Sequence, residues 1–274
     1  MKKKILVIGA TGLIGQPVAE KLQESGFDVR IISRDGMKAR NLFSDAFELV
    51  VGDPTQATQL KAALDGCYGV HINLQGEPEQ IVAEQVARLG AAAGIERITY
   101  ISGATVRQEN RWFPFINYKF LAEQAIQNSG IAYTIFRPTW FMESLPQFVQ
   151  NGRATIFGKQ PIPYHWLAAD DYAAMVTAVY TQNSAVNQTL TLHGPEGITM
   201  MDALSRYCAA VHPDVTPSAM PFWAAKMLAA LMRSGQMKTA VNLMAYFEKV
   251  GELGDPAEAN RLLGAPATTL DKWL

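Results

Sequence analysis

The sequence predicts an α/β fold, a doubly wound parallel sheet with a smaller, mainly helical C-terminal lobe. In the first half of the chain, short β-branched runs alternate with longer helical patterns, as in parallel strands joined by crossover helices. Most of these runs are largely apolar rather than alternating, which is typical of strands covered on both faces. A glycine-rich turn, Gly9–Gly15, also stands directly between the first run and the first helical pattern.

The expected elements alternate regularly along this half of the chain. Strands are expected at Ile5–Ile8, Asp28–Ser33, Glu48–Val51, Val70–Leu74, Ile98–Ile101 and Tyr133–Phe136. Helical spacing is found at Gln16–Glu24, Thr58–Leu64, Pro78–Ala93 and Tyr118–Asn128. The helical patterns end near glycine, the residue type that commonly closes helices, at Gly26, Gly66, Gly94 and Gly130.

The sequence changes character after Pro138, where prolines and glycines interrupt the pattern. We therefore expect a main Rossmann-type domain over residues 1–150 and a smaller C-terminal lobe over residues 151–274. A strand-like run at Thr189–Leu192 is expected to return to the edge of the main sheet, near residues 187–194.

The C-terminal lobe contains a methionine-rich segment, Phe222–Phe247, in which methionines stand among alanine and leucine residues. Methionine fills irregular gaps in protein cores, so we interpret these side chains as core. A pocket wall or the face of a homodimer is the alternative.

The glycine-rich turn predicts a site for a dinucleotide pyrophosphate. Glycines give the turn its backbone freedom and keep side chains away from the phosphates, while the helix N-terminus supplies partial positive charge. The expected contacts are Gly9, Thr11, Gly12, Leu13, Ile14 and Gly15. The alternative is a glycine turn that only permits close packing of helix and strand.

Residues after the second and third expected strands indicate which dinucleotide binds. Arg34 follows the second strand directly, with Lys38 and Arg40 close behind, and cations here accommodate the 2′-phosphate of NADP(H). Asp35 could instead bind the ribose of NAD(H), so NADP(H) is the preferred cofactor rather than the exclusive one. Asp53 is expected near the adenine amino group, with a turn-forming role as the alternative.

With these residues, the chain resembles the NmrA-like group of atypical short-chain dehydrogenases/reductases. The resemblance rests on the glycine-rich turn and on a run that reads Ser-Gly-Ile-Ala-Tyr-Thr-Ile-Phe-Arg-Pro, residues 129–138. Further matching segments are Ser33-Arg34, Val51-Gly52-Asp53, Tyr100-Ile101-Ser102, Lys119 with Glu123, Phe141-Met142-Glu143, Asp170–Ala173 and His193–Thr199. The resemblance covers most of the chain and implies an NAD(P)-binding protein.

Related enzymes use a Tyr-x-x-x-Lys pair, in which the lysine holds the nicotinamide ribose and the tyrosine exchanges a proton. The resemblance implies the lysine role for Lys119, whereas Phe115 stands at the tyrosine position and has no hydroxyl. Tyr118 is a candidate proton donor, although it is out of register with the motif. The resemblance also places cofactor contacts at the carboxyl ends of the middle strands, at Leu74, Ser102 and Pro138.

The function expected from these residues is an oxidoreductase that transfers hydride from NADPH to a small quinone-like or aromatic electrophile. Such an electrophile tolerates the loss of the tyrosine better than a ketone does, because its reduced oxygen is a weaker base. The expected substrate contacts are Trp140, Phe141, Met142, Tyr164 and His165, with ordinary core positions as the alternative. The alternative function is a non-catalytic NADP(H)-sensing regulator that acts through protein partners.

Composition and charge restrict the partners. The 24 Lys and Arg residues against 25 Asp and Glu residues leave a net charge of −1, which disfavours direct nucleic-acid binding and attachment to an anionic membrane. No apolar run reaches the length of a transmembrane helix. Cys67 and Cys208 lie far apart and have no metal-ligand spacing, so we expect no metal site and a reducing, cytoplasmic location.

Overall fold

The computed structural model describes residues 2–182 and 184–274. The chain divides into two compact units, and each is described by itself. The first unit comprises Met1–Pro138, Ala169–Leu192 and Pro256–Ala265, and the second comprises Thr139–Ala168, His193–Asp255 and Pro266–Leu274. The first continuous segment of this unit ends at Pro138, and two later segments complete the unit.

The first unit is built on a seven-stranded sheet in which every neighbouring pair is parallel. Its strand order is β10-β6-β5-β4-β1-β2-β3. The strands are β1 (Lys4–Ile8), β2 (Asp28–Ser33), β3 (Glu48–Val51), β4 (Gly69–Ile72), β5 (Arg97–Ile101), β6 (Ala132–Pro138) and β10 (Gln188–Leu192). The order reverses between β1 and β4, and ligands of doubly wound sheets bind at the carboxyl ends of the strands at such a point.

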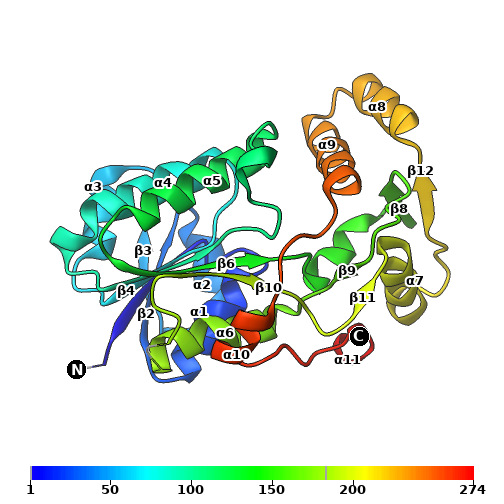
Figure 1. Cartoon of the computed structure of the whole chain (residues 1–274). Coiled ribbons are helices and arrows are strands. Elements are labelled where there is room, and N and C mark those ends of the chain that lie inside the picture. Colours follow the sequence, from blue (N-terminus) through cyan, green and yellow to red (C-terminus); the bar gives the residue numbers. More distant parts are fainter. Residues whose placement is uncertain (1, 183) are drawn as a thin grey trace. The chain divides into compact units, whose positions relative to one another are not determined.

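Helices cover both faces of this sheet (Figure 1). One face carries α3 (Ala57–Leu64), α4 (Glu77–Leu89) and α5 (Pro114–Gln127), and the other carries α1 (Gly15–Glu24), α6 (Ala169–Gln182) and α10 (Ala257–Leu263). Because the helices bury both faces of the sheet, its central strands β1, β4 and β5 are buried along almost their whole length. The doubly wound fold predicted from the sequence is therefore confirmed.

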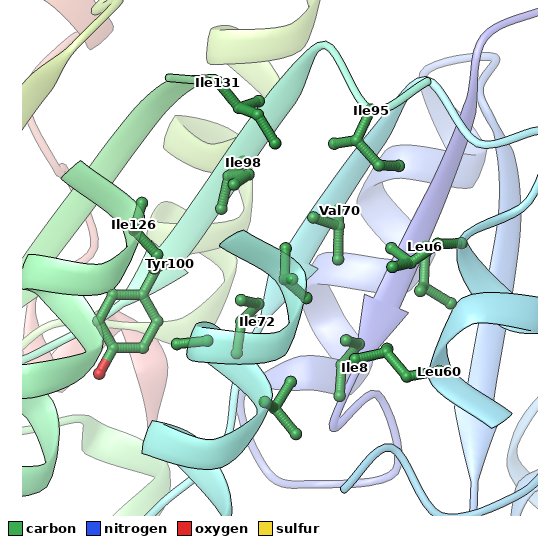
Figure 2. Close-up of a cluster of buried hydrophobic side chains, with 14 of the residues drawn as sticks. Leu6, Ile8, Leu60, Val70, Ile72, Ile95, Ile98, Tyr100, Ile126 and Ile131 are labelled. Atoms are coloured by element: carbon green, nitrogen blue, oxygen red, sulfur yellow. The ribbon is translucent and has the colours of Figure 1, made fainter. Parts of the chain in front are cut away.

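The main core lies between the sheet and the α3–α4–α5 layer. Aliphatic side chains of β1, β4 and β5 meet those of the covering helices, as Figure 2 shows for Leu6, Val70, Ile98, Leu60 and Ile126. Tyr100 projects from β5 at the margin of this cluster, with its hydroxyl pointing away from the aliphatic side chains (Figure 2).

Several element boundaries differ from those expected. Helix α5 begins at Pro114 rather than Tyr118, because proline is well suited to the first turn of a helix. Strand β4 ends at Ile72 rather than Leu74, and β6 continues through Pro138, which pairs with Leu192 of β10.

Two further helical features were not expected at their observed positions. The helix predicted over Pro78–Ala93 consists of α4 and a separate 3₁₀ turn, Ala91–Ala93. Helix α2 (Gly36–Leu42) was not predicted at all, and the Asp35 side chain caps it by accepting a hydrogen bond from the Lys38 amide.

The second unit has more strand structure than the sequence indicated. A three-stranded sheet is formed by β7 (Val149–Gln150), β8 (Arg153–Phe157) and β12 (Ser218–Met220), and β9 (Tyr164–His165) pairs with β11 (Gly197–Ile198). Four of these five strands contain only two or three residues, so they give little periodic signal in a sequence. The helices are α7 (Met200–Val211), α8 (Phe222–Leu231), α9 (Gly235–Val250) and α11 (Leu270–Trp273), with a 3₁₀ segment at Met142–Phe148.

The methionine-rich segment is core only in part. Met244 is buried in the core of the second unit, whereas Met227 and Met232 are more than 60% exposed. Trp223 and Leu231 are exposed on the same helix, α8. The core interpretation is therefore wrong for these two methionines, and the homodimer remains a prediction. None of the helices in the described part of the chain is long and apolar enough to span a bilayer.

Candidate functional site

The glycine-rich turn packs tightly against the end of β4. Gly9 has φ +85°, and a Cβ atom there would lie 1.9 Å from the carbonyl oxygen of Asn73. A Cβ atom on Gly15 would lie 2.2 Å from the Gly9 carbonyl oxygen. These two glycines are therefore required by backbone packing, which agrees with the alternative considered from the sequence.

Gly12 has a different environment within the same turn. Its amide donates a hydrogen bond to the Gly9 carbonyl (3.1 Å), and a Cβ atom on it would meet only that oxygen, at 3.2 Å. Gly12 is exposed, and the neighbouring Leu13 is 49% exposed. Close packing alone does not account for Gly12, so this part of the turn is open to the approach of a ligand.

Helix α1 begins directly after this turn. Its N-cap residue, Ile14, makes no side-chain capping bond, and the first turn of the helix carries no acidic residue. The partial positive charge of this helix end is therefore not neutralised locally. Thr11 and Ile14 are partly exposed beside it. The turn and the helix end together have the features of an anion-binding site.

The cations expected around a 2′-phosphate lie after β2, as predicted. Arg34, Lys38 and Arg40 are all exposed, and Lys38 and Arg40 belong to α2. Asp35 lies among them, but its carboxylate caps α2 through the Lys38 amide at 2.9 Å. That capping bond competes with the ribose-binding role considered for Asp35.

Asp53 forms a turn of its own after β3. Its Oδ1 accepts hydrogen bonds from the amide (2.9 Å) and the hydroxyl (2.8 Å) of Thr55. These bonds, with the nearby Arg34 charge, lower the pKa of the Asp53 carboxyl. The turn-forming role of Asp53 is therefore observed, and its contact with adenine remains a prediction.

Lys119 lies on α5 in a buried polar network. Its Nζ donates to Oε1 of Glu79 at 2.6 Å and to the carbonyl of Ile101 at 3.3 Å. Glu79, on α4, is fully buried, and the same oxygen accepts a 2.6 Å hydrogen bond from the Tyr100 hydroxyl. Burial raises the pKa of Glu79, against the opposing effect of the Lys119 charge. Lys119 Nζ also lies 5.5 Å from the centroid of the Phe115 ring, so these two residues share a helix face as expected.

Ser102 and Arg137 meet at a second buried carboxylate. The Ser102 hydroxyl donates to Glu123 at 2.5 Å, and Arg137 makes two hydrogen bonds to the same carboxylate. Arg137 therefore has a structural role as the partner of this buried carboxylate. Ser102 is buried and its hydroxyl points to Glu123, and contact with a cofactor stays a prediction.

The remaining expected residues of the first unit lie near strand ends. Leu74 follows β4, and its Cδ2 lies 3.4 Å from the position that a Cβ atom on Gly9 would take. Pro138 ends β6, and its carbonyl accepts from the Ala104 amide at 2.8 Å. Tyr118 is partly buried on α5, next to Lys119 but turned by one residue around the helix.

The expected substrate residues all lie in the second unit. Met142 and Tyr164 are buried in its core, and the Tyr164 hydroxyl donates to the Phe247 carbonyl at 3.0 Å. Their surroundings match the alternative that they are ordinary core residues. Trp140, Phe141 and His165 are each partly exposed.

His165 belongs to a cluster that the sequence did not indicate. Its Nδ1 lies 2.5 Å from Oε2 of Glu252, whose other oxygen accepts from the Thr139 hydroxyl and the His165 amide. His193 stacks on the His165 ring with 5° between the planes, and burial lowers its pKa. The ligand atoms of the two histidines and Glu252 lie within 4.8 Å of one another.

This cluster has the composition of a metal site but not its geometry. In-plane lone pairs of two stacked imidazoles do not converge on one ion, so His165 would have to leave Glu252 and rotate. The expectation of no metal site stays a prediction.

The three carboxylates that organise these networks, Glu79, Glu123 and Glu252, could hardly be predicted from the sequence. Glu123 stands four residues after Lys119, a spacing that favours a common helix face, but no role was assigned to it. Glu79 and Glu252 reach their partners over 40 and 87 residues, and a single sequence carries no signal for such contacts.

Together, the reversed strand order and the glycine-rich turn before α1 define the Rossmann-type class of doubly wound proteins. The model of the NmrA-like family matches residues 1–274. The chain therefore belongs to the NmrA-like family, in agreement with the resemblance found in its motifs.

Named relatives and solved structures are similar to this chain over most of its length. An NAD(P)H azoreductase from Xenophilus azovorans is 30% identical over 213 residues, 75% of this chain and 73% of the relative. A (4-alkanoyl-5-oxo-2,5-dihydrofuran-3-yl)methyl phosphate reductase from Streptomyces griseus is 28% identical over 200 residues, 71% of this chain and 69% of the relative. The NADPH complex of a quinone oxidoreductase from Escherichia coli superposes with TM-score 0.77 at 22% identity and covers 98% of both chains.

Proposed function

We propose that this protein is an NADP(H)-dependent reductase of a small, conjugated electrophile, of the quinone or aromatic type. The observation that carries the proposal is the open part of the glycine-rich turn. Gly12 is exposed and less tightly packed than Gly9 and Gly15, and it leads into a helix end whose positive charge is not neutralised. Backbone amides in such a place suit a pyrophosphate.

Arg34 and Lys38 support a preference for NADP(H) over NAD(H). Both side chains are exposed after β2, where a 2′-phosphate is accommodated in this fold class. Asp35, the competing ribose ligand, already caps α2. The named relative from Xenophilus azovorans is an NAD(P)H enzyme, which is compatible with a preference rather than an exclusive choice.

In this account bound NADPH supplies the hydride, and the chain binds and orients the reactants. Lys119 holds the nicotinamide ribose, and Arg34 with Lys38 holds the 2′-phosphate. Phe115 cannot donate a proton, which favours acceptors whose reduced form needs little help from an acid. Trp140, Phe141 and His165 are the partly exposed residues proposed to contact such an acceptor.

The names of the relatives support the same class of substrate. An azo dye and a quinone are both conjugated acceptors, and the proteins named for them are similar to this chain along most of its length. All three named relatives and structures are described as reductases or oxidoreductases, which supports the reductase over the sensing alternative.

The test is to follow loss of NADPH absorbance when the purified protein is given a panel of quinones, azo dyes and aromatic ketones. We expect turnover with the quinones or azo dyes and slower turnover with ketones. Absence of turnover with every acceptor, despite tight NADPH binding, would contradict the reductase and favour the sensor.

A further inference from the structure

Lys119 is held by a carboxylate that neither its motif nor its own helix supplies. Glu79 lies on α4, 40 residues earlier in the chain, and its Oε1 lies 2.6 Å from Lys119 Nζ. Glu79 is fully buried, whereas Lys119 keeps 7% of its side chain exposed. A carboxylate is very rarely buried so completely, so the pairing of Glu79 with Lys119 needs an explanation.

The surroundings of Glu79 fix the position of its Oε1 atom. The Tyr100 hydroxyl donates to that atom at 2.6 Å from β5, the strand that also provides the Ile101 carbonyl for Lys119. Tyr100 is itself fully buried, at the margin of the aliphatic core (Figure 2). The ammonium group is thus contacted by groups on two rigid elements, the Glu79 carboxylate on helix α4 and the Ile101 carbonyl on strand β5.

This arrangement leaves part of the lysine available. An ammonium group has three N–H donors, and the described residues accept from two of them, through Glu79 and the Ile101 carbonyl. The rings of Phe115 and Tyr100 flank Nζ at 5.5 and 5.8 Å and offer no conventional acceptor there. The remaining donor is free for a hydroxyl of a bound ligand.

We infer that Glu79 is the positioning residue for Lys119, and that it directs the ammonium group to the nicotinamide ribose. This inference rests on the proposed function. A free lysine side chain has four flexible bonds, and a fixed carboxylate removes much of the entropy lost when the ammonium group binds a ligand. In this chain, where Phe115 replaces the usual tyrosine, Glu79 is the group that holds the lysine in place.

The experiment compares two ligands by calorimetry. NADPH contains the nicotinamide ribose, whereas 2′,5′-ADP contains only the adenosine half and does not reach Lys119. We expect Glu79→Gln to weaken the binding of NADPH by about tenfold, the loss typical of a charged hydrogen bond. The affinity for 2′,5′-ADP should be unchanged. Glu77→Gln, on the exposed first turn of the same helix, is the matched control and should change neither affinity.

A double-variant cycle separates positioning from general damage. In a Lys119→Met background, Glu79→Gln should weaken NADPH no further, because the positioned group is gone. If Glu79→Gln does not fold, Glu79→Asp retains the charge and shortens the reach, and it should weaken NADPH but not 2′,5′-ADP. Equal weakening of both ligands, or an undiminished effect without the lysine, would overturn the inference. Failure of the wild-type protein to bind NADPH would instead overturn the proposed function.

Discussion

Arg137 makes two hydrogen bonds to Glu123, with Nε 2.9 Å from Oε1 and Nη2 2.5 Å from Oε2. Glu123 is 2% exposed and also accepts from Ser102, so its removal would leave a cation and a hydroxyl without their partner. We expect Glu123→Ala to lower the free energy of unfolding by about 3–5 kcal/mol, as measured by urea titration. The double variant with Arg137→Met should lose less than the sum of the two single losses. A loss below about 1 kcal/mol for Glu123→Ala would show that the pair is replaceable.

The turn before α1 predicts a sharp contrast between two glycines that share a positive φ. Gly9→Ala places a Cβ atom 1.9 Å from the Asn73 carbonyl oxygen, whereas Gly26→Ala meets no atom within 4 Å. We expect Gly26→Ala to lower the free energy of unfolding by about 1 kcal/mol, from backbone strain alone. Gly9→Ala should lower it clearly more. Calorimetry should also show a loss of NADPH binding only for Gly9→Ala. Equal unfolding midpoints for the two variants would contradict the packing described for the turn.

Reversal of one charge should change the choice of cofactor. Arg34 is proposed to face the 2′-phosphate, so Arg34→Glu should weaken NADPH by more than tenfold and NADH much less. Arg88→Glu, an identical charge change on the exposed surface of α4, is the control for the altered net charge. The dissociation constants of the variant for NADPH and NADH test this contact. Equal losses of affinity for the two cofactors would exclude it.

His71 makes the stability of the first unit depend on pH. It is fully buried on β4, its Nδ1 lies 2.9 Å from the Thr99 hydroxyl, and burial lowers its pKa to about 3. An unfolded chain binds a proton at this histidine near pH 6.5 but the folded chain does not, so stability is lost as the pH falls below that value.

Because of this histidine, the free energy of unfolding should be about 2 kcal/mol lower at pH 5 than at pH 7. Each pH unit below 6.5 contributes about 1.4 kcal/mol. We therefore expect His71→Gln to lose correspondingly less stability than the wild type between these two pH values in urea titrations. The variant His212→Gln, in the second unit, is the matched control for removal of a histidine. Parallel pH curves for His71→Gln and the wild type would refute this origin.

The sheet could be predicted from the sequence because its strands are buried on both faces. Runs such as Ile5–Ile8 and Ile98–Ile101 are largely apolar rather than alternating, and the glycines between them mark where the helices end. The small sheets of the second unit could not be predicted, since strands such as β9 and β11 contain two residues each. Periodicity needs a longer run than that.

The candidate site shows the same limit. The glycine-rich turn, Arg34 and Lys119 could be found because each stands at a fixed place relative to a strand or a motif. Glu79 and Glu252 could not, because their partners come from distant segments that only the folded chain brings together. Met227 was assigned to the core from composition, yet its side chain is exposed, because composition does not say which face of a helix is covered.

The proposed function requires that the glycine-rich turn and the cations after β2 bind NADP(H). The most direct measurement is a calorimetric titration of the wild-type protein with NADPH and, separately, with NADH. We expect one NADPH per chain, bound at least tenfold more tightly than NADH. Equal affinity for the two cofactors would contradict the role of Arg34 and Lys38, and no binding of either would contradict the proposed function itself.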